Sequence, residues 1–248
     1  MIPQSKGKMY LAEERGLNET EWFRSYNTFN FGKYQHEHKK PFGSLYVLNE
    51  DTLGGGQSLK WLVEEDTDVI IIPVVGTVEF SDSTGNEGLI EAGAVQMLHL
   101  KAGSTYTTKN PYANDLVKYL QLWIKTPGYP APSYQSAFDL ESYQLLEIFG
   151  QAIPGSNEAG YAGAIGKLNG RQEAVYHKKN PENGIFVYVI QGELEVQYRL
   201  MHDGDGLALW DINEVEFEAL TNDAILLVLE VSPCGHEVSA GKPWECMV

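Results

Sequence analysis

Short β-rich runs recur along the chain, some apolar throughout and others alternating between apolar and polar residues, and turn residues separate them. Clear examples are residues 45–48, 69–75, 94–100, 186–190, 194–198 and 224–231. Runs of this kind at intervals of roughly 8–12 residues, bounded by Gly, Asn, Asp and Pro, are typical of all-β barrels and sandwiches. Helical periodicity is weak, and only residues 13–23 and 139–149 are expected to form short helices. The pattern predicts an all-β fold with few short helices.

A proline-rich segment divides the chain near its middle. Pro127, Pro130 and Pro132 cannot all lie in a central strand, so residues 127–133 are expected to be a linker between domains 1–126 and 134–248. Residues 72–79 and 187–195 share one order: an apolar run, a glycine, then an alternating run that contains Glu. This weak repeat indicates two copies of one β-barrel.

Charge and composition exclude several kinds of protein. The chain has 18 Lys and Arg against 34 Asp and Glu, a net charge of −16, so direct nucleic-acid binding is not expected. No apolar run is long enough to span a bilayer, and the N-terminus lacks the apolar core of a signal peptide. A cytoplasmic protein without membrane contact is predicted. Cys234 and Cys246 are expected to be free thiols, although the sequence leaves their redox state open.

One stretch of the first half is more specific than these patterns. Residues 76–96 read GTVEFSDSTGNEGLIEAGAVQ, and residues 120–124 read LQLWI. This combination resembles the pirin family of bicupins, whose pattern is Gly-x-Leu-x-His-x-Asp-Ser-x-Gly-Asn, then Ala/Pro-Gly-Asp-Val-Gln, then Leu-Gln-Leu-Trp. Residues 24–32 are also similar to that family's N-terminal strand. The resemblance implies two tandem cupin barrels of the jelly-roll type.

The resemblance also implies a metal site, whose ligands this chain lacks. Family members hold a metal with a His-x-His pair and a His-x-Glu pair on strands of the N-terminal barrel. Carried over without gaps, the first pair falls on Leu62 and Glu64 and the second on Tyr106 and Thr108. One carboxylate and one neutral phenol do not make a transition-metal site at neutral pH. A first barrel without metal, and a protein without a cofactor, are therefore expected.

No other motif supplies catalytic or metal-binding residues. The sequence His36-Glu37-His38 is expected in a solvated loop next to Lys39 and Lys40, and the second half has no His-x-His at motif spacing. A nucleophile elbow, a P-loop and a His-Glu-x-x-His motif are absent from the sequence.

The predicted binding site is the interior of the first barrel. Its wall is expected to include six residues: Leu62, Glu64, Gln96, His99, Tyr106 and Thr108. These side chains either bind a small molecule or form a filled polar core.

Three hypotheses about function remain open. The first is a non-catalytic bicupin that binds a small molecule or a protein partner, which the missing ligands favour. The second is a metal-dependent dioxygenase similar to the quercetin-cleaving pirins. The third is a metal-independent enzyme in which Glu64 acts as a base beside Tyr106.

Overall fold

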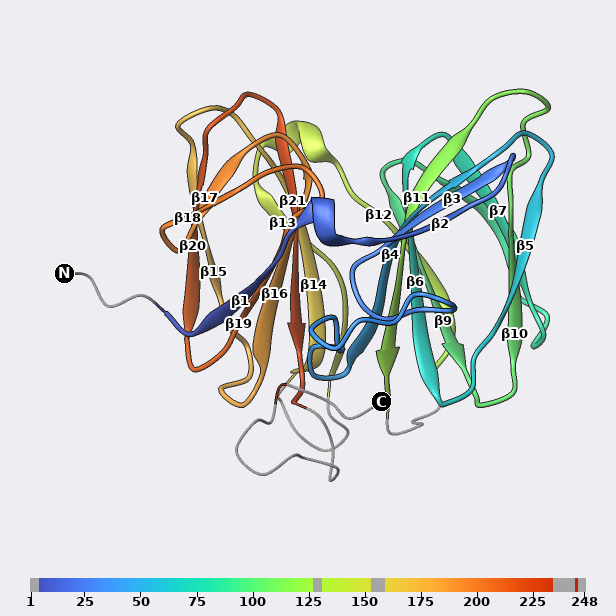
Figure 1. Cartoon of the computed structure of the whole chain (residues 1–248), viewed down its shortest axis with the longest axis horizontal. Helices are drawn as coiled ribbons and strands as arrows, with labels where there is room; N and C mark the ends of the chain where they lie inside the picture. Colours follow the sequence, from blue (N-terminus) through green and yellow to red (C-terminus); the bar gives the residue numbers. More distant parts are fainter. Residues whose placement is uncertain (1–4, 127–130, 153–158, 234–243, 245–248) are drawn as a thin grey trace. The chain divides into compact units, whose positions relative to one another are not determined.

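The computed structural model describes residues 5–126, 131–152, 159–233 and 244, and strands dominate it (Figure 1). Gly16–Phe138 form a first compact unit, and the chain before Gly16 joins the chain from Asp139 onward in a second. Helical structure in these residues is limited to two short 3₁₀ turns, η1 (Ala12–Glu14) and η2 (Leu140–Ser142). None of the described helices is long and apolar enough to cross a membrane. The predicted all-β fold is confirmed.

The first unit consists of two antiparallel sheets packed face to face. The larger sheet has the strand order β12-β9-β6-β11-β4-β3-β2, and the smaller has the order β5-β10-β7-β8. The strands are β2 (Gly16–Glu19), β3 (Phe23–Asn27), β4 (Leu45–Leu53), β5 (Ser58–Leu62), β6 (Thr67–Val75), β7 (Thr77–Asp82), β8 (Glu87–Glu91), β9 (Ala94–Leu100), β10 (Thr105–Lys109), β11 (Val117–Lys125) and β12 (Tyr134–Ala137). Figure 1 shows β5, β7 and β10 on one side of this unit and β4, β6 and β11 on the other.

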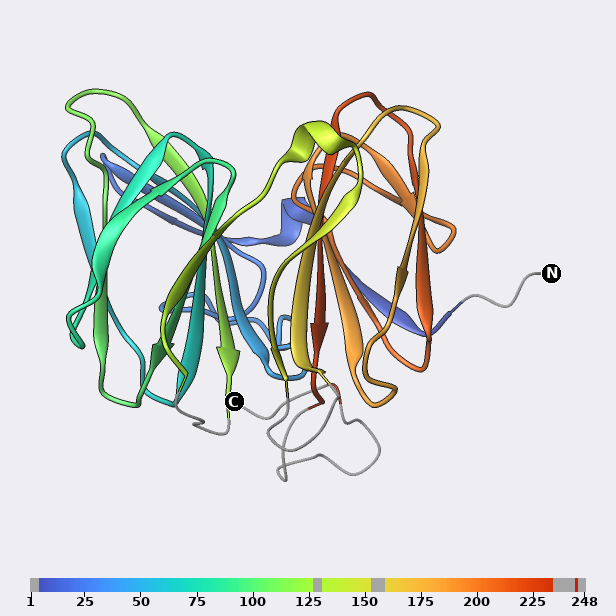
Figure 2. The same cartoon turned by 180° about the vertical axis from the view of Figure 1, so that it is seen from behind.

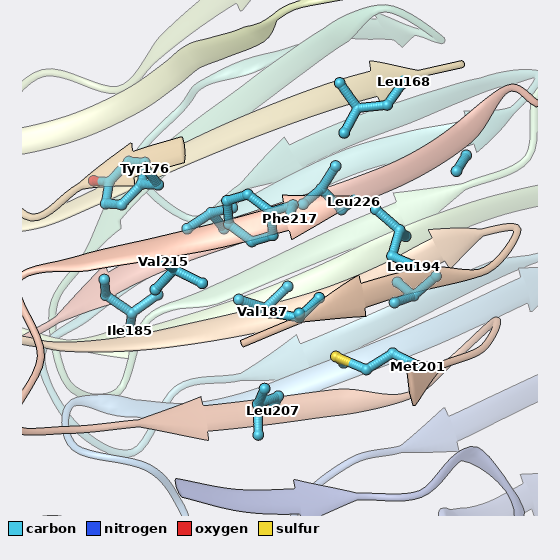
Figure 3. Close-up of a cluster of buried hydrophobic side chains, with 14 of the residues drawn as sticks. Leu168, Tyr176, Ile185, Val187, Leu194, Met201, Leu207, Val215, Phe217 and Leu226 are labelled. Carbon is cyan, nitrogen blue, oxygen red and sulfur yellow. The ribbon is translucent and has the colours of Figure 1, made fainter. Parts of the chain in front are cut away.

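The second unit repeats this arrangement. Its larger sheet has the order β1-β19-β16-β21-β14-β13, and its smaller sheet has the order β15-β20-β17-β18. The strands are β1 (Gly7–Tyr10), β13 (Leu145–Ala152), β14 (Ala159–Leu168), β15 (Glu173–His177), β16 (Gly184–Gln191), β17 (Leu194–Val196), β18 (Arg199–Met201), β19 (Gly206–Leu209), β20 (Glu214–Ala219) and β21 (Ala224–Val231). Figure 3 shows Ile185 and Val187 of β16 together with Val215 and Phe217 of β20 in the core between the sheets. Each unit is thus a jelly-roll sandwich.

The weak internal repeat corresponds to the same structural corner in both units. In the first unit the chain leaves β6 of the larger sheet and enters β7 of the smaller sheet through Gly76, whose φ is +79°. In the second unit it passes from β16 to β17 through Gly192, whose φ is +83°. A positive φ strains any residue with a Cβ, which explains why glycine occupies both corners.

Neither predicted helix forms. Residues 13–23 contain the end of η1 and the hairpin of β2 and β3, which turns where the Thr20 hydroxyl accepts a hydrogen bond from the Phe23 N–H at 3.1 Å. In residues 139–149 the Asp139 carboxylate caps η2 by accepting from the Glu141 N–H at 2.9 Å. Tyr143, with a φ of +50°, then ends the turn before β13 begins. Pairing with neighbouring strands outweighed the modest helix propensity of both segments.

The domain boundaries differ from those predicted at both ends. Strand β1 pairs with β19, so residues 7–10 belong to the second unit, although residues 1–126 were expected to form the first domain. Strand β12 pairs with β9, so the first unit extends to Phe138 instead of ending before residue 127; Figure 2 shows β12 in yellow-green. Which sheet accepts an edge strand depends on long-range pairing, which the local pattern does not reveal. Residues 127–130 of the predicted linker, Cys234 and Cys246 lie outside the described residues.

Candidate functional site

Among the six predicted site residues, Tyr106 and Thr108 face the interior of the first unit from β10. Tyr106 and Thr108 alternate with exposed or half-buried residues along β10, and they are 1% and 0% exposed. Side chains two residues apart on a strand point to the same face, so both project between the two sheets. The predicted inward orientation of these residues is what the structure shows.

Leu62 and Glu64, in contrast, do not line the interior. Leu62 is 53% exposed and Glu64 is also exposed, whereas Val63 between them is fully buried. The strand pairing places Trp61 opposite Tyr106 and Leu59 opposite Thr108. A shift of one residue moves every side chain of a strand to the other face, so the ungapped alignment selected the outer face of β5. The pairing of Glu64 with Tyr106 that the third hypothesis requires is therefore wrong.

Gln96 is buried on the same face of β9 as the core residue Leu98, and His99 is partly buried, but both bond to groups of their own sheet. The Gln96 Nε2 donates to the backbone carbonyl oxygens of Met97 at 2.9 Å and Tyr134 at 3.1 Å, which fastens β12 to β9. His99 lies on the opposite face of β9 from the core residue Leu98, and its Nδ1 is 2.6 Å from the Asp68 Oδ1. His99 as a wall residue of the interior was thus a wrong prediction.

Tyr106 links an indole to an amide on the neighbouring sheet. The Trp123 Nε1 donates to the Tyr106 hydroxyl at 2.8 Å, and the Tyr106 hydroxyl donates to the Gln121 Oε1 at 2.6 Å. Because an indole N–H can only donate, it forces the tyrosine proton toward Gln121. The amide nitrogen Nε2 is therefore the end of Gln121 that remains free.

A second chain of hydrogen bonds runs beside the first. The Trp61 Nε1 donates to the Thr108 Oγ1 at 3.3 Å, and the Thr108 Oγ1 lies 2.9 Å from the Tyr119 hydroxyl. Both chains start at a tryptophan, pass through β10 and end on β11. They lead to the same region of the larger sheet.

Two rows of polar side chains cross that region. In one row Asp51 of β4 lies between Ser25 of β3 and Tyr119 of β11. In the other row Asn49 lies between Asn27 and Gln121. All of these residues occupy the same face as the core residues Val47, Leu53, Phe23 and Trp123.

Four of these residues, Asn27, Asn49, Asp51 and Gln121, are here called the polar cluster, because they carry buried polar atoms without hydrogen-bond partners. Their exposure is 1%, 0%, 0% and 0%, respectively. The partnerless atoms are the Asn27 Oδ1, both amide atoms of Asn49, both carboxylate oxygens of Asp51 and the Gln121 Nε2. Leaving such an atom unsatisfied costs about 1–3 kcal/mol, so a concentration of six calls for an occupant that bonds to them.

Asp51 is the titratable member of the polar cluster. Burial raises its pKa from the ordinary value of 3.8 to about 7, and the neighbouring charge of Glu50 contributes in the same direction. The hydroxyls of Ser25 and Tyr119 lower this pKa, yet neither gives an Asp51 oxygen a partner in hydrogen-bond geometry. Burial also raises the pKa of Tyr106 and of Tyr119, so both phenols are neutral at physiological pH.

The inner faces of β5 and β10 do not offer the donors that a transition metal requires. Leu59, Trp61, Tyr106 and Thr108 supply no imidazole, thiolate or carboxylate. No group of three or more His, Cys, Asp and Glu side chains that could hold a metal occurs in the described part of the chain. His36 and His38 are exposed, as the predicted solvated loop requires.

Replacing Tyr106 with phenylalanine is expected to destabilise the first unit by about 1–2 kcal/mol, because the Trp123 N–H and the Gln121 carbonyl would both lose a buried partner. Urea unfolding followed by tryptophan fluorescence measures this loss. Tyr112→Phe is the matched control, since that hydroxyl bonds Thr77 in a partly buried place. An equal loss in both variants would contradict the role assigned to the Tyr106 hydroxyl.

The polar cluster was missed in the sequence, although a signal for it exists. Val47, Asn49, Asp51 and Leu53 share one face of β4, so two polar residues interrupt an inward-facing apolar series. In the same way, the apolar alternation Leu59, Trp61, Val63 marks the inner face of the segment that includes β5. Because alternate residues of a strand share one face, these two patterns indicate the polar positions on β4 and the inward face of β5.

Comparison with known proteins agrees with this architecture. Residues 10–124 match the family model Pirin, and residues 164–231 match the model Quercetinase C-terminal cupin domain. Quercetin 2,3-dioxygenase from Escherichia coli strain K12 is 27% identical over 227 residues, which cover 87% of this chain and 95% of that protein. Pirin-like protein YhaK from the same organism is 27% identical over 168 residues, or 67% of each chain.

Solved structures share the fold at low sequence identity. The crystal structure of YhhW from Escherichia coli, 24% identical, matches 93% of this chain and 100% of its own with a TM-score of 0.81. The Pirin match covers most of the first jelly-roll unit and the six residues before it, and the second match falls within the second unit, in the order expected of a bicupin. The chain therefore belongs to the pirin family of the cupin superfamily.

Proposed function

We propose that this pirin is a non-catalytic binding protein that holds a small polar molecule between the two sheets of its first unit. The observation that carries the proposal is the polar cluster, with six buried polar atoms that have no partner among the described residues. Binding sites for small molecules are typically apolar and aromatic walls with a few convergent polar groups. Trp61, Tyr106 and Trp123 supply such a wall next to the polar cluster.

The side chains on the inner faces of β5 and β10 argue against the metal-dependent chemistry of the family. The resemblance implies three imidazoles and a carboxylate, but the inner positions of β5 and β10 hold Leu59, Trp61, Tyr106 and Thr108. With the observed register of β5, the inner positions are Leu59 and Trp61, and neither side chain is an imidazole. These four side chains do not fit the family's metal, and they favour binding over reaction at a metal centre.

Release of the bound molecule provides the direct test. Protein purified without chelator is unfolded, and the filtrate is analysed by mass spectrometry. We expect close to one equivalent of one small organic molecule from the native protein and much less from Asn49→Ala. Asn18→Ala, on the exposed edge strand β2 of the same sheet, is the control and should retain the molecule. A native protein without ligand, or equal amounts from both variants, would refute the proposal.

Quercetin 2,3-dioxygenase activity is the second candidate, because the Escherichia coli enzyme aligns over 95% of its length. With Fe²⁺, Mn²⁺, Ni²⁺ or Cu²⁺ added in turn, we expect no oxygen consumption above the blank when quercetin is supplied. Metal analysis of the purified protein should find well below one equivalent of any first-row metal. Turnover that depends on one metal would restore this second candidate. A protein partner remains a prediction from the sequence.

A further inference from the structure

The carboxylate of Asp51 is buried, and no positively charged side chain of the described residues pairs with it. The other titratable groups that face it are Tyr106 and Tyr119, both neutral, while Glu50, its neighbour in the chain, pairs with Lys118 at 3.0 Å. A buried carboxylate is stabilised in its charged form by hydrogen-bond donors or by a compensating positive charge, and Asp51 has neither among the described residues.

Oxygen acceptors surround this carboxylate. The Asn27 Nδ2 donates to the Ser25 hydroxyl at 2.9 Å, which leaves the Asn27 Oδ1 as the free end of that amide. The Asn49 Oδ1 is also free, and the Ser25 and Tyr119 residues flank Asp51 on the adjacent strands. Carboxylate, amide and hydroxyl oxygens coordinate alkali-metal ions and accept hydrogen bonds from ammonium ions.

The number of carboxylates in the polar cluster indicates the charge of the ion that it can bind. Calcium sites usually combine several carboxylates, whereas this cluster contains one. A single carboxylate balances one positive charge. The protonated amine of an organic molecule would donate hydrogen bonds to the same oxygens. Acceptor atoms elsewhere in that molecule would then bond to the free N–H groups of Asn49 and Gln121.

We propose that the polar cluster recognises a monovalent cationic group at Asp51, with the free amide oxygens of Asn27 and Asn49 completing its surroundings. The group is either a small inorganic cation or the protonated primary amine of a larger ligand. The inference deepens the proposed function, since it states what chemistry the bound molecule presents to the polar cluster. Protons compete with the cation for Asp51, so binding strengthens as the pH rises through about 7.

The test compares melting temperatures of the full chain in chloride salts at equal ionic strength. Na⁺, K⁺, NH₄⁺ and ethylammonium are compared with tetramethylammonium, which carries the same charge but has no N–H group and whose methyl groups keep oxygen atoms away from that charge. At about pH 8, at least one of the four should raise the melting temperature by about 5 °C or more at saturation. The rise should shrink at about pH 6, where Asp51 is largely protonated.

Asp51→Asn keeps the shape of the side chain and removes its charge, so it should abolish the difference between the salts. Asp66→Asn is the matched control, because Asp66 pairs with Lys101 at the surface and its variant should retain the difference. Equal melting temperatures in all five salts, or a difference that persists in Asp51→Asn, would overturn the inference. The four cations also distinguish an inorganic cation from an organic amine. A larger rise in melting temperature with ethylammonium than with NH₄⁺ would indicate an organic amine.

Crystals soaked in Tl⁺ give a second readout that does not depend on stability. An anomalous peak at Asp51 is expected for an inorganic cation, and ethylammonium should displace it if the ligand is an amine. Ordered water in the polar cluster without any anomalous peak would contradict a cation site. A neutral molecule recovered by mass spectrometry whose binding is unchanged in Asp51→Asn would refute this inference alone and leave the proposed function standing.

Discussion

Replacing Glu230 with alanine is expected to destabilise the second unit by about 4 kcal/mol, the largest effect we predict for a single side chain. Glu230 is fully buried on β21 and accepts four hydrogen bonds. The Lys179 N–H and the Asn180 N–H donate at 2.8 Å each, and the Tyr176 hydroxyl and the Asn183 Nδ2 donate at 3.0 Å each. Alanine would leave all four donors without this acceptor, three of them in buried positions.

Urea unfolding with circular dichroism and tryptophan fluorescence measures this change in the free energy of unfolding. Glu195→Ala provides the control, since Glu195 is exposed on β17 and its removal should cost little. If Glu230→Ala lost no more stability than Glu195→Ala, the network around Glu230 would not hold the second unit together.

Replacing Asp51 with asparagine is expected to stabilise the protein increasingly as the pH rises. The folded-state pKa of Asp51, about 7, lies above the unfolded value of 3.8, so the folded state binds more protons between these values. The stability of the native protein therefore falls as the pH rises through this window, and the asparagine variant lacks this loss. Between about pH 5 and pH 8 the advantage of Asp51→Asn should grow by about 3 kcal/mol.

The comparison is made in tetramethylammonium chloride, so that no small cation compensates the charge of Asp51. Asp66→Asn should show no such growth, because its ion pair with Lys101 and the Ala102 N–H lower the pKa of Asp66 instead of raising it. A stability difference between native protein and Asp51→Asn that is constant with pH would show that the carboxylate is not desolvated in the folded state.

Glu230 and Asp51 show two ways in which a jelly roll accommodates a buried carboxylate. Glu230 is fully satisfied by donors of its own unit, which is typical of a structural role. Asp51 has no such donors, and its neighbours Asn27 and Asn49 also have free acceptor atoms. The contrast favours the first unit as the one that binds a ligand.

The fold could be predicted because its signals are local. Residues 94–100 and 224–231 are mostly apolar runs of strand length, which is typical of strands buried on both faces, and the glycines at 76 and 192 mark corners that need a positive φ. The pirin motif in residues 76–96 lies in the same stretch, where β7, β8 and β9 follow one another. In this stretch the strand pattern, the turn residues and the family resemblance all indicated the same fold, which allowed the architecture of two jelly rolls to be predicted.

The sequence by itself determined the all-β class and the repeated corner. Only the tertiary structure decided which face of β5 points inward, that β1 and β12 are edge strands of units other than those predicted, and that Asn27, Asn49, Asp51 and Gln121 meet. The reason is physical: strand alternation is local, whereas register and pairing are set by hydrogen bonds between segments far apart in the chain.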